Sequence, residues 1–247
     1  MHAVNSISEY ILLNNYGVSI MTRLVLKLFY FSLVSALTMN FANAQSGIGY
    51  YVQAENPAAY IQAIEKLSSV SGSAGIQTVV SVAVANGPGT ATHFVSQQGD
   101  ALSDVDNFRQ LSLDSPEFSE FNSAVQGNRT LTAEVIYNSL GVNNGKASVV
   151  TSPNSYSWHI HLLVTDIPAY LEALEELMDV NDGDVYMQAF QTFGTGLGGG
   201  NIVVVNSANS LEELLTNNKG YDVFIEKTID IRTPIANGIY QTIARFD

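Results

Sequence analysis

Residues 60–67 read Tyr-Ile-Gln-Ala-Ile-Glu-Lys-Leu, and residues 170–177 read Tyr-Leu-Glu-Ala-Leu-Glu-Glu-Leu. The two octapeptides match at their aromatic, aliphatic and acidic positions. Their apolar residues recur at the three-to-four spacing of an amphipathic helix. A helix-capping residue and a proline precede each of them: Asn56 with Pro57, and Asp166 with Pro168. The sequence therefore predicts two equivalent helices.

Further matches follow in the same order along both halves of the chain. They are Phe118-Ser119-Glu120 with Phe224-Ile225-Glu226, Arg129-Thr130 with Arg232-Thr233, and Tyr137 with Tyr240. One short match means little, but an ordered series over nearly the whole unit indicates an internal duplication. The drift in the offset between the copies places short gaps in loops.

Each copy is predicted to contain four strands and two helical regions. In the first copy the strands are 50–53, 78–85, 91–96 and 131–140, with a helix from Pro57 and helical pieces at 103–111 and 115–125. In the second copy the strands are 158–164, 185–193, 201–205 and 235–245, with helices at 168–179, 211–217 and 221–229. The glycine-rich residues 194–200 are predicted to form a hairpin turn, which we expect near the barrel mouth.

The order β-α-β-β-α-β is that of a ferredoxin-like unit, whose sheet carries helices on one face only. The open faces are covered if the two antiparallel sheets face each other. The fold class predicted is thus α+β, a pseudo-dimeric barrel made from one chain. The sequence resembles the dimeric α+β barrel superfamily over about residues 48–247. That superfamily includes antibiotic-biosynthesis-type monooxygenases, NIPSNAP-like proteins and stress-responsive barrel proteins, and its members hold their ligand between the sheets.

The first 44 residues are predicted to lie outside the fold. Arg23 and Lys27 precede a short apolar run, and Ala42-Asn43-Ala44 ends it, which is the pattern of a secretory signal peptide. We expect residues 1–20 to be an over-long N-terminal extension and 21–44 to be the signal peptide. The first repeat would then span 45–140, a linker 141–155, and the second repeat 156–247. The expected location is periplasmic or extracellular.

Composition excludes several classes of partner. Residues 45–247 contain 22 acidic and 8 basic residues, a net charge of −14, and no cysteine. Nucleic-acid binding needs a basic surface, so it is not expected, and the cleaved chain is not expected on anionic membranes. No disulfide supports the fold. We expect a monomer or a weak homo-oligomer.

Alternation along the first strand of each copy predicts which residues face the space between the sheets. Trp158, Ile160, Leu162 and Val164 share an apolar face, which leaves His159 and His161 on the other. The repeat places Tyr51 and Gln53 on the corresponding face of the first copy. These four residues are the predicted lining of a ligand pocket.

Two further groups are candidates for chemistry. His159 and His161 can reach one metal ion, with His93 or Glu134 as a third ligand, although structural histidines are the commoner explanation. Tyr137 and Tyr240 are equivalent positions that can donate to a ligand or simply pack. Arg129 and Arg232 repeat in both copies, which favours a structural role in tying a helix end to a strand start. No metal or cofactor is predicted.

The sequence leaves three functions open. The first is non-catalytic binding of a small, largely apolar molecule between the sheets. The second is a monooxygenase-like or haem- or metal-handling enzyme that uses His159 and His161. The third is a structural or interaction protein without a pocket. No catalytic residue is assigned, and whether the chain is an enzyme stays open.

Overall fold

The computed structural model describes residues 45–246 except residues 86–88, 90, 182, 184 and 195–197. These described residues belong to one compact unit. The predicted extension and signal peptide, residues 1–44, lie outside the described residues. Within the described part, no helix has the length and apolar character needed to span a bilayer.

The order of the elements confirms two βαββαβ units. The first contains β1 (Ser46–Ala54), α2 (Pro57–Ser73), β2 (Gln77–Ala85), β3 (His93–Gly99), α3 (Leu102–Leu113), α4 (Pro116–Val125) and β4 (Arg129–Asn144). The second contains β5 (Tyr156–Val164), α6 (Ile167–Val180), β6 (Tyr186–Phe193), β7 (Ile202–Ala208), α7 (Leu211–Thr216), α8 (Tyr221–Thr228) and β8 (Arg232–Phe246). Between them, α5 (Ser148–Thr151) is a one-turn helix that the linker sequence did not predict.

The predicted caps begin the long helices. The Asn56 side chain accepts a hydrogen bond from the Ala59 amide at 3.2 Å, and the Asp166 side chain accepts one from the Ala169 amide at 3.1 Å. Each bond satisfies one backbone N–H that the first helical turn leaves without a partner. The repeated sequence motif therefore produces the same local structure twice.

The eight strands close into one antiparallel barrel in the order β1-β3-β2-β8-β5-β7-β6-β4. The long strands β4 and β8 make the closure. The first part of β4 pairs with β1 and its later part with β6, while β8 pairs with β5 and then with β2. The two sheets therefore join through hydrogen bonds as well as facing each other, and the barrel has no free edge.

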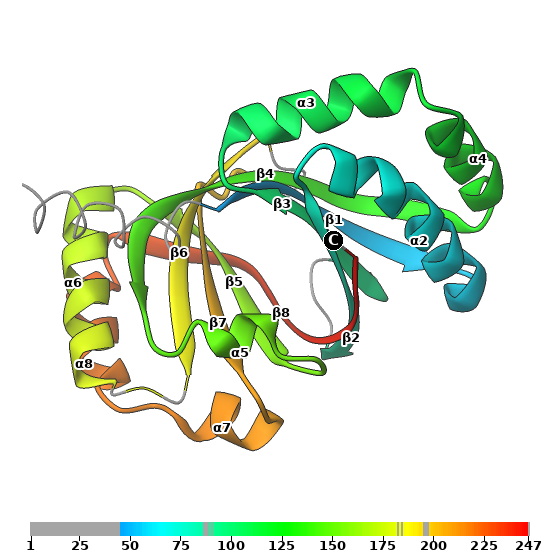
Figure 1. The fold of residues 1–247 in the computed structure, drawn as a ribbon. Coiled ribbons are helices and arrows are strands. Elements are labelled where there is room, and N and C mark those ends of the chain that lie inside the picture. Colours follow the sequence, from blue (N-terminus) through cyan, green and yellow to red (C-terminus); the bar gives the residue numbers. More distant parts are fainter. Residues whose placement is uncertain are drawn as a thin grey trace, which may run out of the picture. The chain divides into compact units, whose positions relative to one another are not determined.

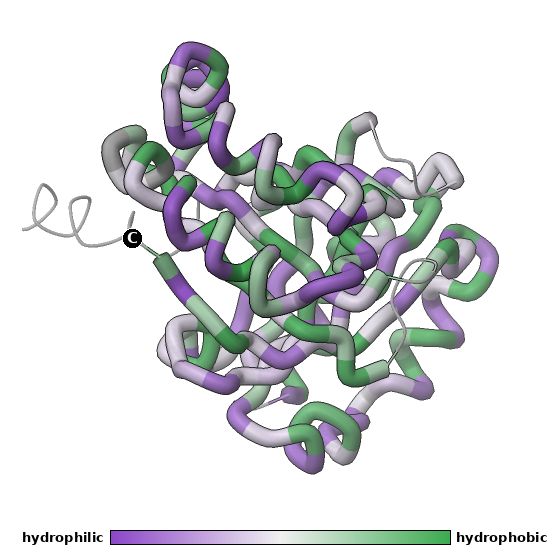
Figure 2. Tube along the Cα trace, turned by 90° about the vertical axis from the view of Figure 1, so that its right-hand side faces the viewer, coloured by the Kyte–Doolittle hydropathy of each residue, from purple (hydrophilic) through white to green (hydrophobic). Residues whose placement is uncertain are grey.

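Helices cover the outside of the barrel on two sides. Figure 1 shows α2, α3 and α4 over one side and α6, α7 and α8 over the other. Alternation along β1 and β5 is confirmed: Val52 packs under α2, and Leu162 and Val164 pack under α6. Hydrophobic and hydrophilic stretches alternate along the helices in Figure 2, as one-sided burial requires.

The repeated arginines tie helices to strands, but one sequence match was wrong. Arg232 lies over the Phe224 ring at 5.1 Å, and Arg129 lies over Phe121 at 5.2 Å. The counterpart of Phe224 is thus Phe121, not Phe118. The match of Phe118 with Phe224 rested on sequence similarity alone. In the structure, Phe121 lies on the buried face of its helix, beneath the arginine.

Gly47 allows a close approach between β1 and β4. A Cβ atom there would lie 2.4 Å from the Tyr137 hydroxyl and 2.5 Å from the Gln97 backbone oxygen. We expect Gly47→Ala to lower the free energy of unfolding by about 1–3 kcal/mol, because backbone atoms cannot move aside cheaply. Urea unfolding measures this.

Gly72 provides the matched control for that substitution. It is exposed near the end of α2, where alanine is favoured over glycine by about 1 kcal/mol. Gly72→Ala should therefore leave stability unchanged or raise it. Equal effects of the two substitutions would contradict the close approach at Gly47.

Candidate functional site

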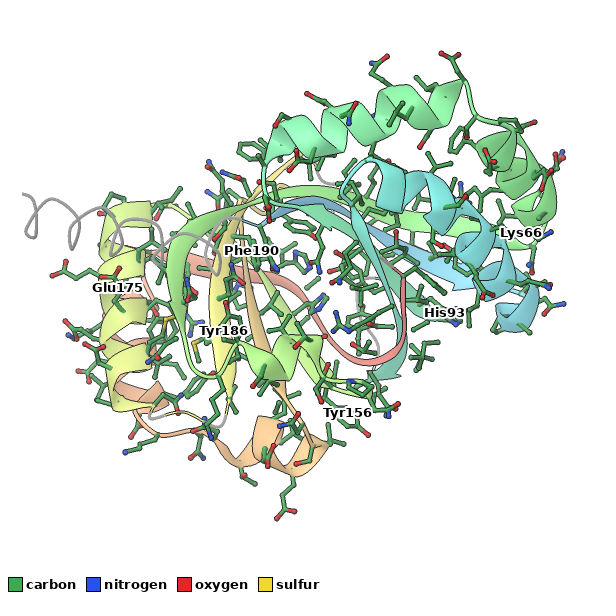
Figure 3. The ribbon with its side chains drawn as sticks, in the orientation of Figure 1. Lys66, His93, Tyr156, Glu175, Tyr186 and Phe190 are labelled. Carbon is green, nitrogen blue, oxygen red and sulfur yellow. The ribbon has the colours of Figure 1, made fainter. Side chains whose placement is uncertain are left out.

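A cavity of about 110 Å³ lies inside the barrel. All eight strands contribute to its wall, together with Val150 of α5. Five of the lining residues are aromatic: Tyr51, Phe94, Tyr137, Tyr186 and Phe190. Figure 3 labels Tyr186 and Phe190 on β6. A single water needs roughly 10–15 Å³ of such volume, so the cavity has room for a small organic molecule.

Tyr51 joins two histidines inside this cavity. Its hydroxyl lies 2.6 Å from Nε2 of His161 and 3.1 Å from Nδ1 of His159. The other ring nitrogen of His159, Nε2, lies 3.1 Å from the Ser157 hydroxyl. The result is a hydrogen-bonded chain across the barrel, from Ser157 through His159 and Tyr51 to His161. It links residues of the two repeats that are more than 100 positions apart.

The chain of hydrogen bonds has a direction, because a phenol carries one proton. In one arrangement Tyr51 donates to His161 and accepts from His159, which in turn accepts from Ser157. In the other, every one of these bonds is reversed. Reversal exchanges which nitrogen of His161 carries its proton. The cluster can therefore offer either a donor or an acceptor at His161, according to the partner it meets.

Burial keeps the imidazoles neutral. It lowers the pKa of His159 to about 3, with a smaller contribution from neighbouring His161, and it lowers the pKa of His161 to about 4. Burial also raises the pKa of the Tyr51 phenol, with further contributions from Tyr240 and Tyr137. At neutral pH the cluster is uncharged and acts through hydrogen bonds.

The two repeats differ at the positions around the histidine cluster. By the strand register, Gly49 faces Val135, and its counterpart His159 faces Gly238. Each pair therefore has one small and one larger member. Gly238 leaves room for the His159 ring, and Gly49 leaves room for Phe94, whose ring a Cβ atom there would meet at 2.7 Å.

The two matched tyrosines occupy equivalent places in the register, since Tyr137 faces Gly47 and Tyr240 faces Ser157. Tyr137 lines the cavity, and its hydroxyl lies 2.5 Å from the Ser96 hydroxyl. The Tyr240 ring packs 4.9 Å from the His159 ring, and its buried hydroxyl has no partner among the described residues.

Three sequence expectations need correction. His93 and Glu134 do not join the paired histidines, because alternation places them on the outer, helix-covered face of the sheet. The His93 ring packs 6.1 Å from Tyr60 of α2, and Figure 3 shows it near that helix. Gln53 is not among the cavity-lining residues. In the described ranges, no three side chains from histidine, cysteine, aspartate and glutamate gather around a point where a metal would bind.

The cavity wall is formed mainly by the strand ends nearest α5. Residues 194 and 198–200, the described part of the glycine-rich turn, do not line it. The described residues of the turn therefore contribute nothing to the cavity wall, and a position of the turn near a mouth of the barrel stays a prediction. The turn joins β6 to β7, and the cavity wall on β6 begins at the opposite end, at Tyr186.

Arg245 is the functional candidate that the sequence did not reveal. It is the one charged side chain among the described residues that line the barrel cavity. Its guanidinium donates to the Val150 carbonyl of α5 and to Oε1 of Gln77 at 3.4 Å. Nothing near it in the sequence signals this role, because α5 and β8 meet only in the folded barrel.

Solved structures with the same architecture are similar to this chain at low sequence identity. The candidate monooxygenase of Fusobacterium nucleatum has a TM-score of 0.57 at 8% identity, covering 85% of this chain and 96% of its own. The candidate monooxygenase of Lactobacillus acidophilus gives 0.52 at 12%, covering 83% and 95%. A chlorite dismutase variant from Candidatus Nitrospira defluvii gives 0.50 at 11%, covering 83% and 93%.

Neither the protein-family profiles nor the curated protein sequences give a match to this chain. The similarity to solved structures therefore concerns the fold alone. These neighbours belong to one superfamily, and the match to this chain extends over almost their whole length. The chain has the fold of the dimeric α+β barrel superfamily, with both halves of the barrel supplied by one polypeptide.

Proposed function

We propose that the protein binds a small, largely apolar molecule inside its barrel, with Tyr51, His159 and His161 as the polar contacts. The observation that carries this proposal is a cavity with aromatic walls and a neutral hydrogen-bonding cluster on one side. Ligand pockets generally combine apolar walls with a few convergent polar groups. A barrel interior filled with side chains would instead have favoured a protein without a pocket.

The lining restricts the ligand by size and charge. Pockets for drug-sized molecules are roughly 300–1,000 Å³, so a cavity of about 110 Å³ suits a smaller molecule, such as a substituted phenol. The described lining contains no carboxylate and one guanidinium, that of Arg245. A neutral or anionic ligand is therefore favoured over a cation.

An enzyme acting on such a molecule is the second candidate, and the monooxygenase neighbours favour it. The lowered pKa values of the histidines argue against general-base catalysis. Moving a proton from a phenol of pKa about 10 to an imidazole of pKa about 4 costs about 8 kcal/mol. The cluster is better suited to recognising a hydroxyl group than to removing its proton.

Haem does not fit the barrel interior. Pockets for drug-sized ligands and cofactors are roughly 300–1,000 Å³, whereas this cavity is about 110 Å³. In addition, both ring nitrogens of His159 and Nε2 of His161 are already engaged in hydrogen bonds. We propose no reaction step that uses this group.

The place of action is proposed from the sequence. The pattern of residues 21–44 supports export, so the ligand would be met in the periplasm or outside the cell. The net charge of −14 for residues 45–247 favours a soluble monomer or weak homo-oligomer there.

The test uses p-cresol and toluene, which have the same aromatic body and differ by one hydroxyl group. Isothermal titration calorimetry should show p-cresol binding at least about tenfold more tightly, because one good hydrogen bond contributes about 1.4 kcal/mol. Ser81 lines the cavity, and Ser81→Phe should abolish binding of both compounds by filling the space. His161→Phe should remove only the preference for p-cresol.

A matched control lies on the same strand. Val84 is 44% exposed, so Val84→Phe adds the same ring outside the barrel and should leave both affinities unchanged. Equal affinity for p-cresol and toluene in the wild type would refute the role of the cluster. Binding that survives Ser81→Phe would refute the barrel as the site. Turnover of p-cresol with oxygen would favour the enzymatic candidate.

A further inference from the structure

We propose a second binding site, on the outer face of the first repeat beneath α3, for a small amphiphile with a carboxylate head and an apolar chain. A cavity of about 230 Å³ lies there, between the sheet and helices α2, α3 and α4. It is separate from the barrel interior, because its wall uses the opposite faces of β1, β3 and β4. The proposal is independent of the ligand inside the barrel.

The walls of this second cavity are mostly apolar. Ile64 and Leu67 of α2, Phe118 and Phe121 of α4, and Val95 of β3 form much of its surface. Leu113 is 66% exposed and Leu131 is 43% exposed, so an apolar rim reaches solvent at its mouth. A hydrocarbon chain entering here would bury apolar surface that now faces water.

Charged groups gather at the same cavity. Arg109, Arg129 and Glu134 line it, and within the described chain none of them forms an ion pair. Arg129 is already used by the fold, since its guanidinium lies over the Phe121 ring and its charge acts on the buried Tyr60 phenol, lowering that phenol's pKa against the effect of burial. Arg109 is exposed and remains for a ligand. With two guanidinium groups against one carboxylate, the site has one positive charge to be balanced.

Ser112 adds a second polar contact. Its side chain is only 3% exposed, and its hydroxyl has no hydrogen-bond partner among the described residues. A buried hydroxyl without a partner destabilises the fold, and a ligand oxygen would supply the missing hydrogen bond. Arg109 and Ser112 are three residues apart on α3 and therefore share a helix face. A carboxylate between them would accept from both.

The second repeat serves as an internal comparison. Aligned from their N-caps, Ala101 and Ser210, α3 has 12 residues and α7 has 6. The additional turns of α3 are residues 108–113, and they supply all four α3 side chains of the cavity: Phe108, Arg109, Ser112 and Leu113. The first repeat thus has an additional helical segment, in which Arg109 forms no ion pair and the Ser112 hydroxyl has no hydrogen-bond partner among the described residues.

The second repeat also differs at the positions that correspond to the floor of this cavity. In the second repeat Asn206 donates to the Tyr221 hydroxyl at 3.1 Å, so these polar groups pair with each other. The strand register makes Gln97 the counterpart of Asn206, and the offset of Arg129 and Arg232 makes Phe118 the counterpart of Tyr221. Phe118 has no hydroxyl, so Gln97 faces the cavity without that partner.

Two arginines at one cavity are unusual in a chain with so few basic residues. Residues 45–247 contain 8 basic side chains against 22 acidic ones, and two of the 8 line this single cavity. A surface that repels anions elsewhere is locally able to accept one. A cationic amphiphile would be expected if the acidic excess continued into the site.

The experiment compares octanoate with 1-octanol, which share a chain length and differ in the charge of the head group. Titration calorimetry on the full chain should show octanoate binding that weakens at least about tenfold in Arg109→Gln, whereas 1-octanol binding should not change. Ser112→Leu should abolish octanoate binding by filling the cavity. Leu113→Glu, at an exposed position that tolerates substitution, should weaken octanoate alone by repulsion.

Two controls locate the site. Lys66 is exposed on α2, where Figure 3 labels it, and it is not among the residues that line the cavity, so Lys66→Gln should leave octanoate binding unchanged. Ser81→Phe, which fills the barrel, should also leave it unchanged, so the two proposals fail separately. Absence of octanoate binding, equal effects of Arg109→Gln and Lys66→Gln, or loss of binding in Ser81→Phe with retention in Ser112→Leu would overturn the proposal.

Discussion

The free energy of unfolding is expected to fall steeply as the pH is lowered from about 6.5 to about 4. His159 and His161 have pKa values of about 3 and about 4 in the folded protein, against about 6.5 in the unfolded chain. Between these values the unfolded chain binds two protons that the folded protein does not. Stability is therefore complete above the unfolded pKa and is lost as the pH falls toward the folded values.

The size of this effect follows from proton linkage. Each histidine contributes a slope of up to about 1.4 kcal/mol per pH unit, so the pair gives up to about 2.7 kcal/mol per pH unit. Urea unfolding at about pH 7, 6 and 5 measures the slope before most carboxylates titrate. In the double variant His159→Gln with His161→Gln, most of the slope should disappear.

His93 provides the control for assigning this slope. Burial also lowers its pKa, but it lies outside the barrel. His93→Gln should remove a smaller part of the slope than the double variant. A wild-type slope that is flat between about pH 7 and 5, or that the double variant leaves unchanged, would show that the barrel histidines are not held neutral by the fold.

Removing the Tyr51 side chain is expected to lower the stability of the fold more than Gly47→Ala does. Tyr51 is 1% exposed and packs against Phe94, Tyr240 and both barrel histidines. Tyr51→Ala should lower the free energy of unfolding by about 3–5 kcal/mol, because large-to-small changes in a core lose contacts and leave a cavity. Thermal and urea unfolding measure the loss.

Tyr51→Phe separates the hydroxyl from the ring. It keeps the packing but leaves ring nitrogens of His159 and His161 without a partner, which should cost about 1–3 kcal/mol. The preference for p-cresol over toluene should change as well. Tyr156→Phe is the matched control, since Tyr156 is half-buried at the start of β5, and its effect should stay within about 0.5 kcal/mol. Equal effects of the two phenylalanine variants would contradict a structural role for the Tyr51 hydroxyl.

Much of the fold could be predicted because the signals are local. Helix periodicity and caps identified α2 and α6, and the duplicated motifs identified the two units. Period-two alternation placed Tyr51, His159 and His161 on the inner face, since the side chains of a strand point to opposite faces whatever lies beside it. The polar cluster of the candidate site was therefore largely visible in the sequence.

Other features depended on contacts between distant segments. His93 and Glu134 lie on the outer face because α2, α3 and α4 cover that side of the sheet, and this covering depends on packing between distant segments. The equivalence of Phe121 with Phe224 needed the position of the arginine above each ring. No local pattern brings Arg245 to the α5 carbonyl of Val150, or α3 over the cavity that Arg109 and Ser112 line.

The sequence by itself determined the repeat, the order of the elements and the inward face of each first strand, because these follow from periodicity and capping within a few residues. Only the tertiary structure decided that β4 and β8 close the barrel, that Tyr51 lies between His159 and His161, and how much space remains inside. The physical reason is that strand register and cavity volume arise from packing between residues far apart in the chain, on which local propensities have no influence.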